Sequence, residues 1–271
     1  MEFLVQIISY PFARRAIIVG LLLSVSAALL GVNLVLKRFS MLGDGLSHVS
    51  FGAAAVGLAC GVAPLQFSIP IVVIAAFLLL RLKQNSKING DAATAIVSSS
   101  ALAIGITVAT LTTGMNTDIS NYMFGSVLAL GKAEVVIASI CGTLIISIYI
   151  LFYHKIFASV FDEDFAAVTG VKIKWYNSIN AVLTAITVVI GMRVMGALLI
   201  SSIITFPALS SMRICKHYKC TVIAAAIISA ISFLVGILLS FAFDLPAGAA
   251  VVLTNLAAFL ILSMVGKIKQ I

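Results

Sequence analysis

Charged residues are scarce in this sequence of 271 residues. Lys, Arg, Asp and Glu together make up 10% of it and hydrophobic residues 62%, whereas a soluble domain is about 25% charged. So few charges cannot cover the apolar surface of a water-soluble core of this size, which excludes a soluble globular enzyme and a disordered chain. The net charge of +8 comes from basic residues spread between long uncharged runs. That spacing is typical of membrane topology and excludes a nucleic-acid-binding module.

Cysteine clusters and catalytic motifs are also missing. The sequence has four cysteines, Cys60, Cys141, Cys215 and Cys220. They form no C-x-x-C pair and no cluster with histidine, so we expect neither a disulfide framework nor a structural zinc site. The segment Gly125–Lys132 comes nearest to a P-loop, but it has one residue too many between its glycines, and Ala133 follows where Ser or Thr would bind magnesium. With no nucleophile–base pair and no H-E-x-x-H segment, we expect a protein that is not an enzyme.

Long uncharged runs predict an all-α fold, a polytopic membrane helical bundle that forms one domain over residues 1–271. A crossing needs about 20 apolar residues, and its backbone must hydrogen-bond internally, which a helix achieves. The run Gly45–Leu80 is long enough for two crossings, which Pro64 separates. The nine candidate crossings are Ala16–Leu36, the two halves of Gly45–Leu80, Ala92–Thr113, Val135–Tyr153, Trp175–Met192, Val194–Met212, Thr221–Phe243 and Leu245–Gly266.

One uncharged segment, Ile119–Gly131, is too short to cross at about 13 residues. It predicts a re-entrant segment lined by protein or by a water-filled cavity, so we expect eight or nine crossings. Small residues at close spacing, Ala27 with Gly31, Ala101 with Gly105, and Gly52 with Ala53 and Ala55, predict close packing between helices. The alternative for any one pair is that membrane helices are simply rich in alanine and glycine.

The distribution of basic residues predicts the orientation of these nine crossings. With the N-terminus outside and the C-terminus in the cytoplasm, thirteen of the 17 basic residues fall on the cytoplasmic side, as the positive-inside rule requires. The four on the outer side are Arg14, Arg15, Lys132 and Arg193.

Asp44 and His48 form the clearest candidate site. They lie four residues apart at the start of the second crossing, so a helix places them on one face. A carboxylate and an imidazole can together hold a divalent first-row metal ion, and ionisable groups within a membrane segment are typical of functional sites. The alternative is a structural hydrogen bond between the two that caps the start of the helix, since Asp44 lies near the predicted cytoplasmic end.

The longest charged loop, His154–Lys174, contains a second candidate. Ser159 and Asp162 fit the S-x-x-D capping pattern, so we expect a helix of about ten residues that begins there, with acidic residues in its first turn. Thr169 and Gly170 would end it. Its predicted acidic turn and apolar face consist of Asp162, Glu163, Asp164, Phe161, Phe165 and Val168. This cytoplasmic surface helix could dock a soluble partner or could seal the bundle.

Three segments make the chain resemble the permease subunit of bacterial ABC importers for zinc and manganese, the ABC-3 metal-permease family. They are Gly43–His48, Phe161–Gly170 and Gly196–Ala208, the last being a Gly-x-Leu-Leu run that ends in Pro-Ala. The resemblance covers nearly the whole chain. One departure is Leu209-Ser210-Ser211, where many relatives have Ala-Thr-Ala.

The resemblance implies a homodimer in the bacterial inner membrane, with an ATPase subunit dimer below it and an extracytoplasmic metal-binding protein above. Asp44 and His48 would bind the transported ion, zinc first and manganese next, and ATP would bind the partner subunit. No tightly bound cofactor is implied. The predicted surface helix would be the coupling helix, through Phe161, Asp162, Glu163, Asp164, Phe165, Val168 and Gly170.

A second hypothesis is a stand-alone proton-coupled transporter of divalent cations, in which Asp44 and His48 would form a proton relay. Such carriers often show inverted repeats, and we find none in this sequence.

Overall fold

The computed structural model describes residues 11–85, 90–112, 131–161 and 163–268, and this part of the chain consists of helices joined by short turns, without strands. Its long helices are α2 (Pro11–Leu36), α3 (Leu42–Ala59), α4 (Pro64–Asn85), α5 (Gly90–Leu111), α7 (Lys132–Leu151), α10 (Ile173–Met195), α11 (Ala197–Ile214), α12 (Tyr218–Phe243) and α13 (Ala247–Ile268). Two short helices, α8 (Tyr153–Phe161) and α9 (Glu163–Val168), lie between α7 and α10. The predicted all-α bundle is confirmed.

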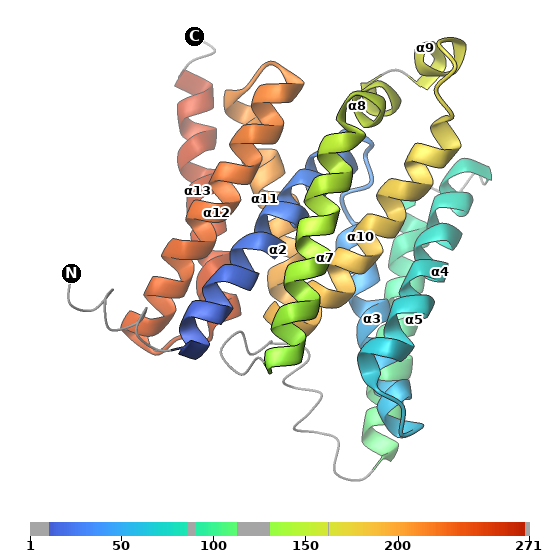
Figure 1. Cartoon of the computed structure of the whole chain (residues 1–271), viewed down its shortest axis with the longest axis vertical. Coiled ribbons are helices and arrows are strands. Elements are labelled where there is room, and N and C mark those ends of the chain that lie inside the picture. The colour runs from blue at the N-terminus through green and yellow to red at the C-terminus, as the bar shows by residue number, and fades with distance from the viewer. Residues whose placement is uncertain (1–10, 86–89, 113–130, 162, 269–271) are drawn as a thin grey trace.

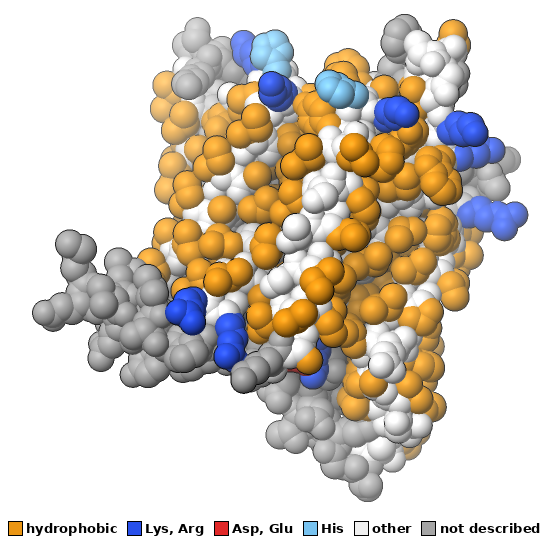
Figure 2. Space-filling model, viewed as in Figure 1, with side chains coloured by type: hydrophobic (Ala, Val, Ile, Leu, Met, Phe, Trp, Pro, Cys, Tyr) orange, Lys and Arg blue, Asp and Glu red, His pale blue; other side chains and the backbone are white. Residues whose placement is uncertain are grey.

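The long helices lie side by side and alternate in direction (Figure 1). Helices α2, α4, α7, α11 and α13 run toward the end of the bundle where α8 and α9 lie, and α3, α5, α10 and α12 start there. We call this the α9 end. Apolar side chains cover the flank of the bundle, and Lys, Arg and His side chains gather toward its two ends (Figure 2).

Eight of these helices are long and apolar enough to cross a membrane. The remaining long helix, α3, has 18 residues, which include Asp44 and His48, and it is not among these eight. It packs against α4, α5, α10 and α11, within the same layer of helices. The expected eight or nine crossings are therefore confirmed, and the predicted division at Pro64 falls where α4 begins. Nearly all of the predicted re-entrant segment Ile119–Gly131 lies outside the described residues.

Small residues permit two close helix crossings. A Cβ atom at Gly31 of α2 would lie 1.9 Å from the carbonyl oxygen of Ile204 in α11. A Cβ atom at Gly52 of α3 would lie 2.5 Å from the carbonyl oxygen of Ala101 in α5. Neither space admits a side chain, so the small residues that predicted close packing are required at these two crossings.

Two connections between consecutive helices are short. Helices α10 and α11 are joined by one residue, Gly196, whose φ is 89°. The turn between α11 and α12 brings Cys215 and Cys220 to a Cα–Cα distance of 5.7 Å, and their sulfur atoms form a disulfide. The sequence predicted no disulfide framework and treated these cysteines as packing residues, and it missed this one pair, which a tight reversal of the chain brings together.

Candidate functional site

The link from α2 to α3 determines where the second crossing begins. After Leu36, the chain turns through Arg38, which adopts a left-handed conformation with φ of 53°. The amide of Phe39 donates to the carbonyl of Leu34 at 2.8 Å, and the amide of Leu42 donates to the carbonyl of Phe39 at 3.2 Å. These bonds start α3 at the α9 end. Asp44 consequently lies in the first turn of α3, where the helix dipole stabilises its carboxylate.

Asp44 and His48 lie together on one face of α3, as their spacing predicted. The Nε2 atom of His48 is 3.7 Å from Oδ2 of Asp44, and the two side chains are 26% and 45% exposed respectively. That separation is too long for a hydrogen bond, so the capping bond of the alternative reading is not formed. A single metal ion bonded to both atoms at about 2.1 Å would fit between them. Within the described residues, no third His, Cys, Asp or Glu joins the pair to make a larger cluster.

The predicted surface helix is present in altered form. Helix α8 ends at Phe161 and α9 begins at Glu163, so the prediction of one helix of about ten residues from Ser159 was wrong. Ser159 is buried inside α8 and donates its hydroxyl hydrogen to the carbonyl of Ile156, and it caps nothing. The misleading signal was a local S-x-x-D match inside α8, which begins six residues earlier, at Tyr153. Asp162 lies outside the described residues.

Helix α9 nevertheless ends where the sequence predicted. The amide of Val171 donates to the carbonyl of Ala166 at 2.9 Å, and Gly170 has a φ of 80°. Phe161 and Val168 are 77% and 87% exposed, but Phe161 belongs to α8, so the proposed apolar face is not formed by a single helix. Asp164 and Phe165 also belong to α9, but their side chains lie outside the described part. The surface at α9 thus carries exposed apolar groups at the end of the bundle.

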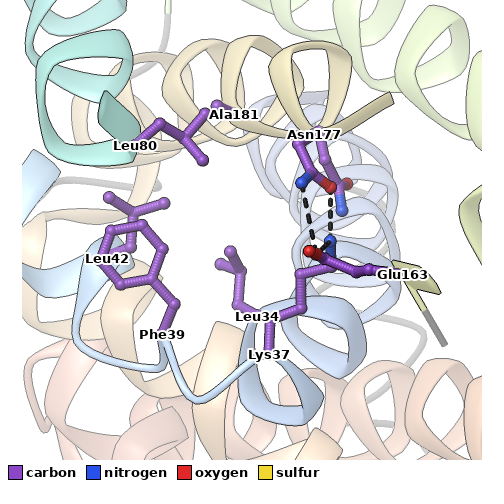
Figure 3. Close-up of a pocket in the computed structure, with 9 residues that line it drawn as sticks. Leu34, Lys37, Phe39, Leu42, Leu80, Glu163, Asn177 and Ala181 are labelled. Carbon is purple, nitrogen blue, oxygen red and sulfur yellow. Dashed lines mark hydrogen bonds and ion pairs between the residues drawn. The ribbon is translucent and has the colours of Figure 1, made fainter. Parts of the chain in front are cut away.

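A polar bridge that sequence reasoning missed connects α9 to the long helices (Figure 3). The Nζ atom of Lys37 is 2.9 Å from Oε1 of Glu163 and also donates to Oδ1 of Asn177 in α10. Asn177 in turn donates from Nδ2 to Glu163 at 3.5 Å. Burial lowers the pKa of Lys37, and the hydrogen bond and charge of Glu163 oppose that shift. The pair is separated by 126 residues, so no local pattern could have indicated it.

A second polar network lies deeper, among α2, α7, α10 and α12. The hydroxyl of Tyr218 donates to Oδ1 of Asn33 at 2.7 Å, and the Tyr149 hydroxyl lies 2.9 Å from that of Tyr218. Asn33, which is fully buried, donates from Nδ2 to Asn180 at 3.4 Å. These bonds satisfy polar groups that would otherwise be costly in an apolar interior. They tie four helices together near the α9 end.

At the opposite end of the bundle, an ion pair joins α7 to α10. The Nη2 atom of Arg193 lies 2.8 Å from Oε1 of Glu134, and the side chains are 40% and 29% exposed. Glu134 also accepts a hydrogen bond from the amide of Gly131, which caps the start of α7. The two ends of the bundle therefore each have an ion pair that links neighbouring elements.

Comparison with known proteins agrees with this architecture. The chain is 29% identical over 246 residues to a protein of Haemophilus influenzae named high-affinity zinc uptake system membrane protein ZnuB, covering 91% of this chain and 94% of the relative. It is 26% identical over 260 residues to the manganese import system permease protein ScaB of Streptococcus gordonii, covering 96% and 93%.

A solved structure shares the fold over nearly the same length. The structure described as PsaBC from Streptococcus pneumoniae in complex with Fab superimposes with a TM-score of 0.86 at 26% identity, covering 96% of this chain and 94% of that one. The sequence profile of the ABC 3 transport family matches residues 9–266. Relatives named for zinc and for manganese are about equally similar, and they are membrane permeases rather than enzymes. This multi-pass membrane protein therefore belongs to the ABC 3 transport family, the permeases of metal-transporting ABC systems.

Proposed function

We propose that this chain forms the translocation path of an ATP-driven importer for divalent metal ions, with zinc the first candidate and manganese the second. The observation that carries the proposal is the Asp44–His48 pair, a carboxylate and an imidazole 3.7 Å apart at the start of a buried helix. Zinc binds well to an imidazole ligand, whereas ions that prefer oxygen ligands alone bind less well to such a pair. The relative named for zinc uptake is also 29% identical to this chain.

The exposure of the pair supports a dimeric path. Two ligands are too few for a bound divalent ion, because zinc sites usually have four. Asp44 is 45% and His48 26% exposed on a single chain, so a second copy of the chain can approach them. In our proposal, the second copy faces this surface and adds its own pair of ligands. The four side chains together would replace part of the water shell that the ion loses on the way through the bilayer.

We assign the two other proposed partners, the ATPase and the extracytoplasmic metal-binding protein, to opposite ends of the bundle. We place the α9 end in the cytoplasm of a bacterial inner membrane, since thirteen of the 17 basic residues fall on that side. An ATPase subunit dimer would bind there at α9, through the exposed Val168 and the neighbouring Phe161. The set proposed for coupling is Phe161, Asp162, Glu163, Asp164, Phe165, Val168 and Gly170. An extracytoplasmic metal-binding protein would deliver the ion at the opposite end.

Uptake by cells that lack the chromosomal copy of this chain tests the metal site. Asp44→Asn and His48→Gln should each lower uptake of radioactive zinc by at least about tenfold, since even residues that only orient a metal ligand contribute that much. Matched controls are Asp91→Asn, an exposed acid in the first turn of α5, and His217→Gln, an exposed histidine at the start of α12. Parallel uptake of radioactive manganese would rank the two metals.

Two results would contradict the site. One is normal uptake by Asp44→Asn and His48→Gln with protein levels equal to wild type. The other is loss of folding in both variants, measured by size-exclusion chromatography, which would assign the pair a structural role. For the coupling surface, Phe165→Asp should reduce binding of the purified ATPase, and undiminished binding would reject the docking role of α9.

A further inference from the structure

The bridge between α9 and the end of α2 lies at the edge of a cavity. The cavity has a volume of about 320 Å³ and lies between α2, α3, α4 and α10, with Lys37, Glu163 and Asn177 along one edge (Figure 3). Helix α9 packs on α8 and α10, and it reaches α2 through the Glu163 side chain. The ion pair and Asn177 therefore form a direct polar link between α9 and the end of α2, in addition to the packing of α9 on α8 and α10.

Lys37 lies immediately before the connection that leads to the metal pair. Its amide donates to the carbonyl of Asn33 at 3.0 Å, which continues the last turn of α2. The chain then turns back through Phe39, whose two backbone hydrogen bonds fasten the link to both helices. Helix α3 starts at Leu42, and Asp44 is in its first turn. A displacement of Lys37 thus reaches Asp44 through a short connection with fixed geometry.

We propose that Lys37 is a positioning residue that couples α9 to the Asp44–His48 pair. When the ATPase displaces α9, the Glu163–Lys37 ion pair moves the link between α2 and α3, and Asp44 moves with it. The inference rests on the proposed function, in which α9 contacts the ATPase and Asp44 holds the ion. It gives the bridge a mechanical role that does not require Lys37 to touch the metal or the ATPase.

The environment of the bridge makes the charge of each partner important. The side chain of Lys37 is 17% exposed and that of Glu163 is 57% exposed, so the amine is the more buried partner and depends more on its contacts. Exchanging the two charges retains the attraction across the same gap. Asn177 can serve either arrangement, because its amide offers both donors and an acceptor and can turn over.

The test uses the complete complex, reconstituted in proteoliposomes with its ATPase and metal-binding protein, and measures zinc ions transported per ATP hydrolysed. Lys37→Met and Glu163→Gln should each lower this ratio about tenfold, a usual size for coupling between two sites. Lys37→Glu combined with Glu163→Lys should recover at least half of the wild-type ratio. Lys174→Met, an exposed lysine in the first turn of α10, is the matched control and should retain the wild-type ratio.

The outcomes separate this inference from the proposed function. A wild-type complex that moves no zinc with ATP overturns the proposed function and this inference together. A wild-type complex that transports zinc, with Asp44→Asn inactive but Lys37→Met at the wild-type ratio, overturns the inference alone. If the Lys37→Met complex does not assemble, the transport ratio of the Lys37→Glu, Glu163→Lys double variant tests the inference instead. Recovery supports the ion pair as the link, and an assembled but uncoupled exchange variant overturns it.

Discussion

Replacing Gly31 with alanine tests how closely α2 and α11 approach. The added Cβ atom would lie 1.9 Å from the carbonyl oxygen of Ile204, whereas carbon and oxygen come into contact at about 3.4 Å. The two helices must therefore separate by about 1.5 Å, the difference 3.4 − 1.9. A backbone carbonyl within a helix cannot turn aside as a side chain can. We expect a cost at the upper end of the usual range for overpacking, about 3 kcal/mol.

The assay is thermal melting of the purified protein in detergent, followed by size-exclusion chromatography. At about 2–4 °C per kcal/mol for a chain of this size, the Gly31→Ala protein should melt about 6–12 °C below wild type. The matched control is Gly142→Ala on α7, which also faces α2. Its Cβ atom would lie 3.4 Å from Cβ of Leu22, an ordinary contact, so its melting temperature should not fall.

The substitution should also affect transport. The Cδ1 atom of Ile204 lies 2.8 Å from where a Cβ atom at Gly43 would be, so the residue that Gly31 contacts also reaches the first turn of α3. Separating α11 from α2 should therefore shift Asp44, a residue of the proposed site, and lower metal uptake. A Gly31→Ala protein that melts within about 2 °C of wild type would refute the described crossing.

Two further predictions concern the polar contacts. Tyr218→Phe and Tyr149→Phe should each lower the free energy of unfolding by about 0.5–1.5 kcal/mol. Because both hydroxyls share Asn33, the double variant should lose less than the sum, which a double-mutant cycle on melting data would show; strict additivity would argue against a shared network. Arg193→Met should cost no more than about 1 kcal/mol, since the Arg193–Glu134 pair is partly exposed. A melting shift above about 5 °C would mean that this ion pair is more important than its exposure indicates.

Features of the fold that depend on local sequence were predictable. Long apolar runs gave the crossings, because a membrane helix must satisfy its backbone within itself and needs a fixed length. Pro64 marked a real boundary, and the spacing of Asp44 and His48 fixed their common face. The family resemblance rested on segments of this kind, and the family match confirmed it.

Contacts between distant segments were not predictable from one sequence. Lys37 and Glu163 are 126 residues apart, and they meet because α9 packs beside α10, which itself packs on α2. The break between α8 and α9 was also missed, because the S-x-x-D match at Ser159 occurs inside a helix rather than at its start. The Cys215–Cys220 pairing depends on how tightly the chain reverses between two helices, which composition does not encode.

The single-residue junction at Gly196 couples the movements of α10 and α11. Because only Gly196 separates Met195 from Ala197, a shift of α10 along its axis is passed directly to the start of α11. Helix α10 carries Asn177 at one extremity, and the next helix carries Ile204, against which Gly31 and Gly43 pack. A displacement of Asn177 would therefore pass along α10 and back along α11 to Ile204. This gives a second route by which it would reach the neighbourhood of Asp44. The first turn of α3, which carries Asp44, would then be displaced from two sides at once.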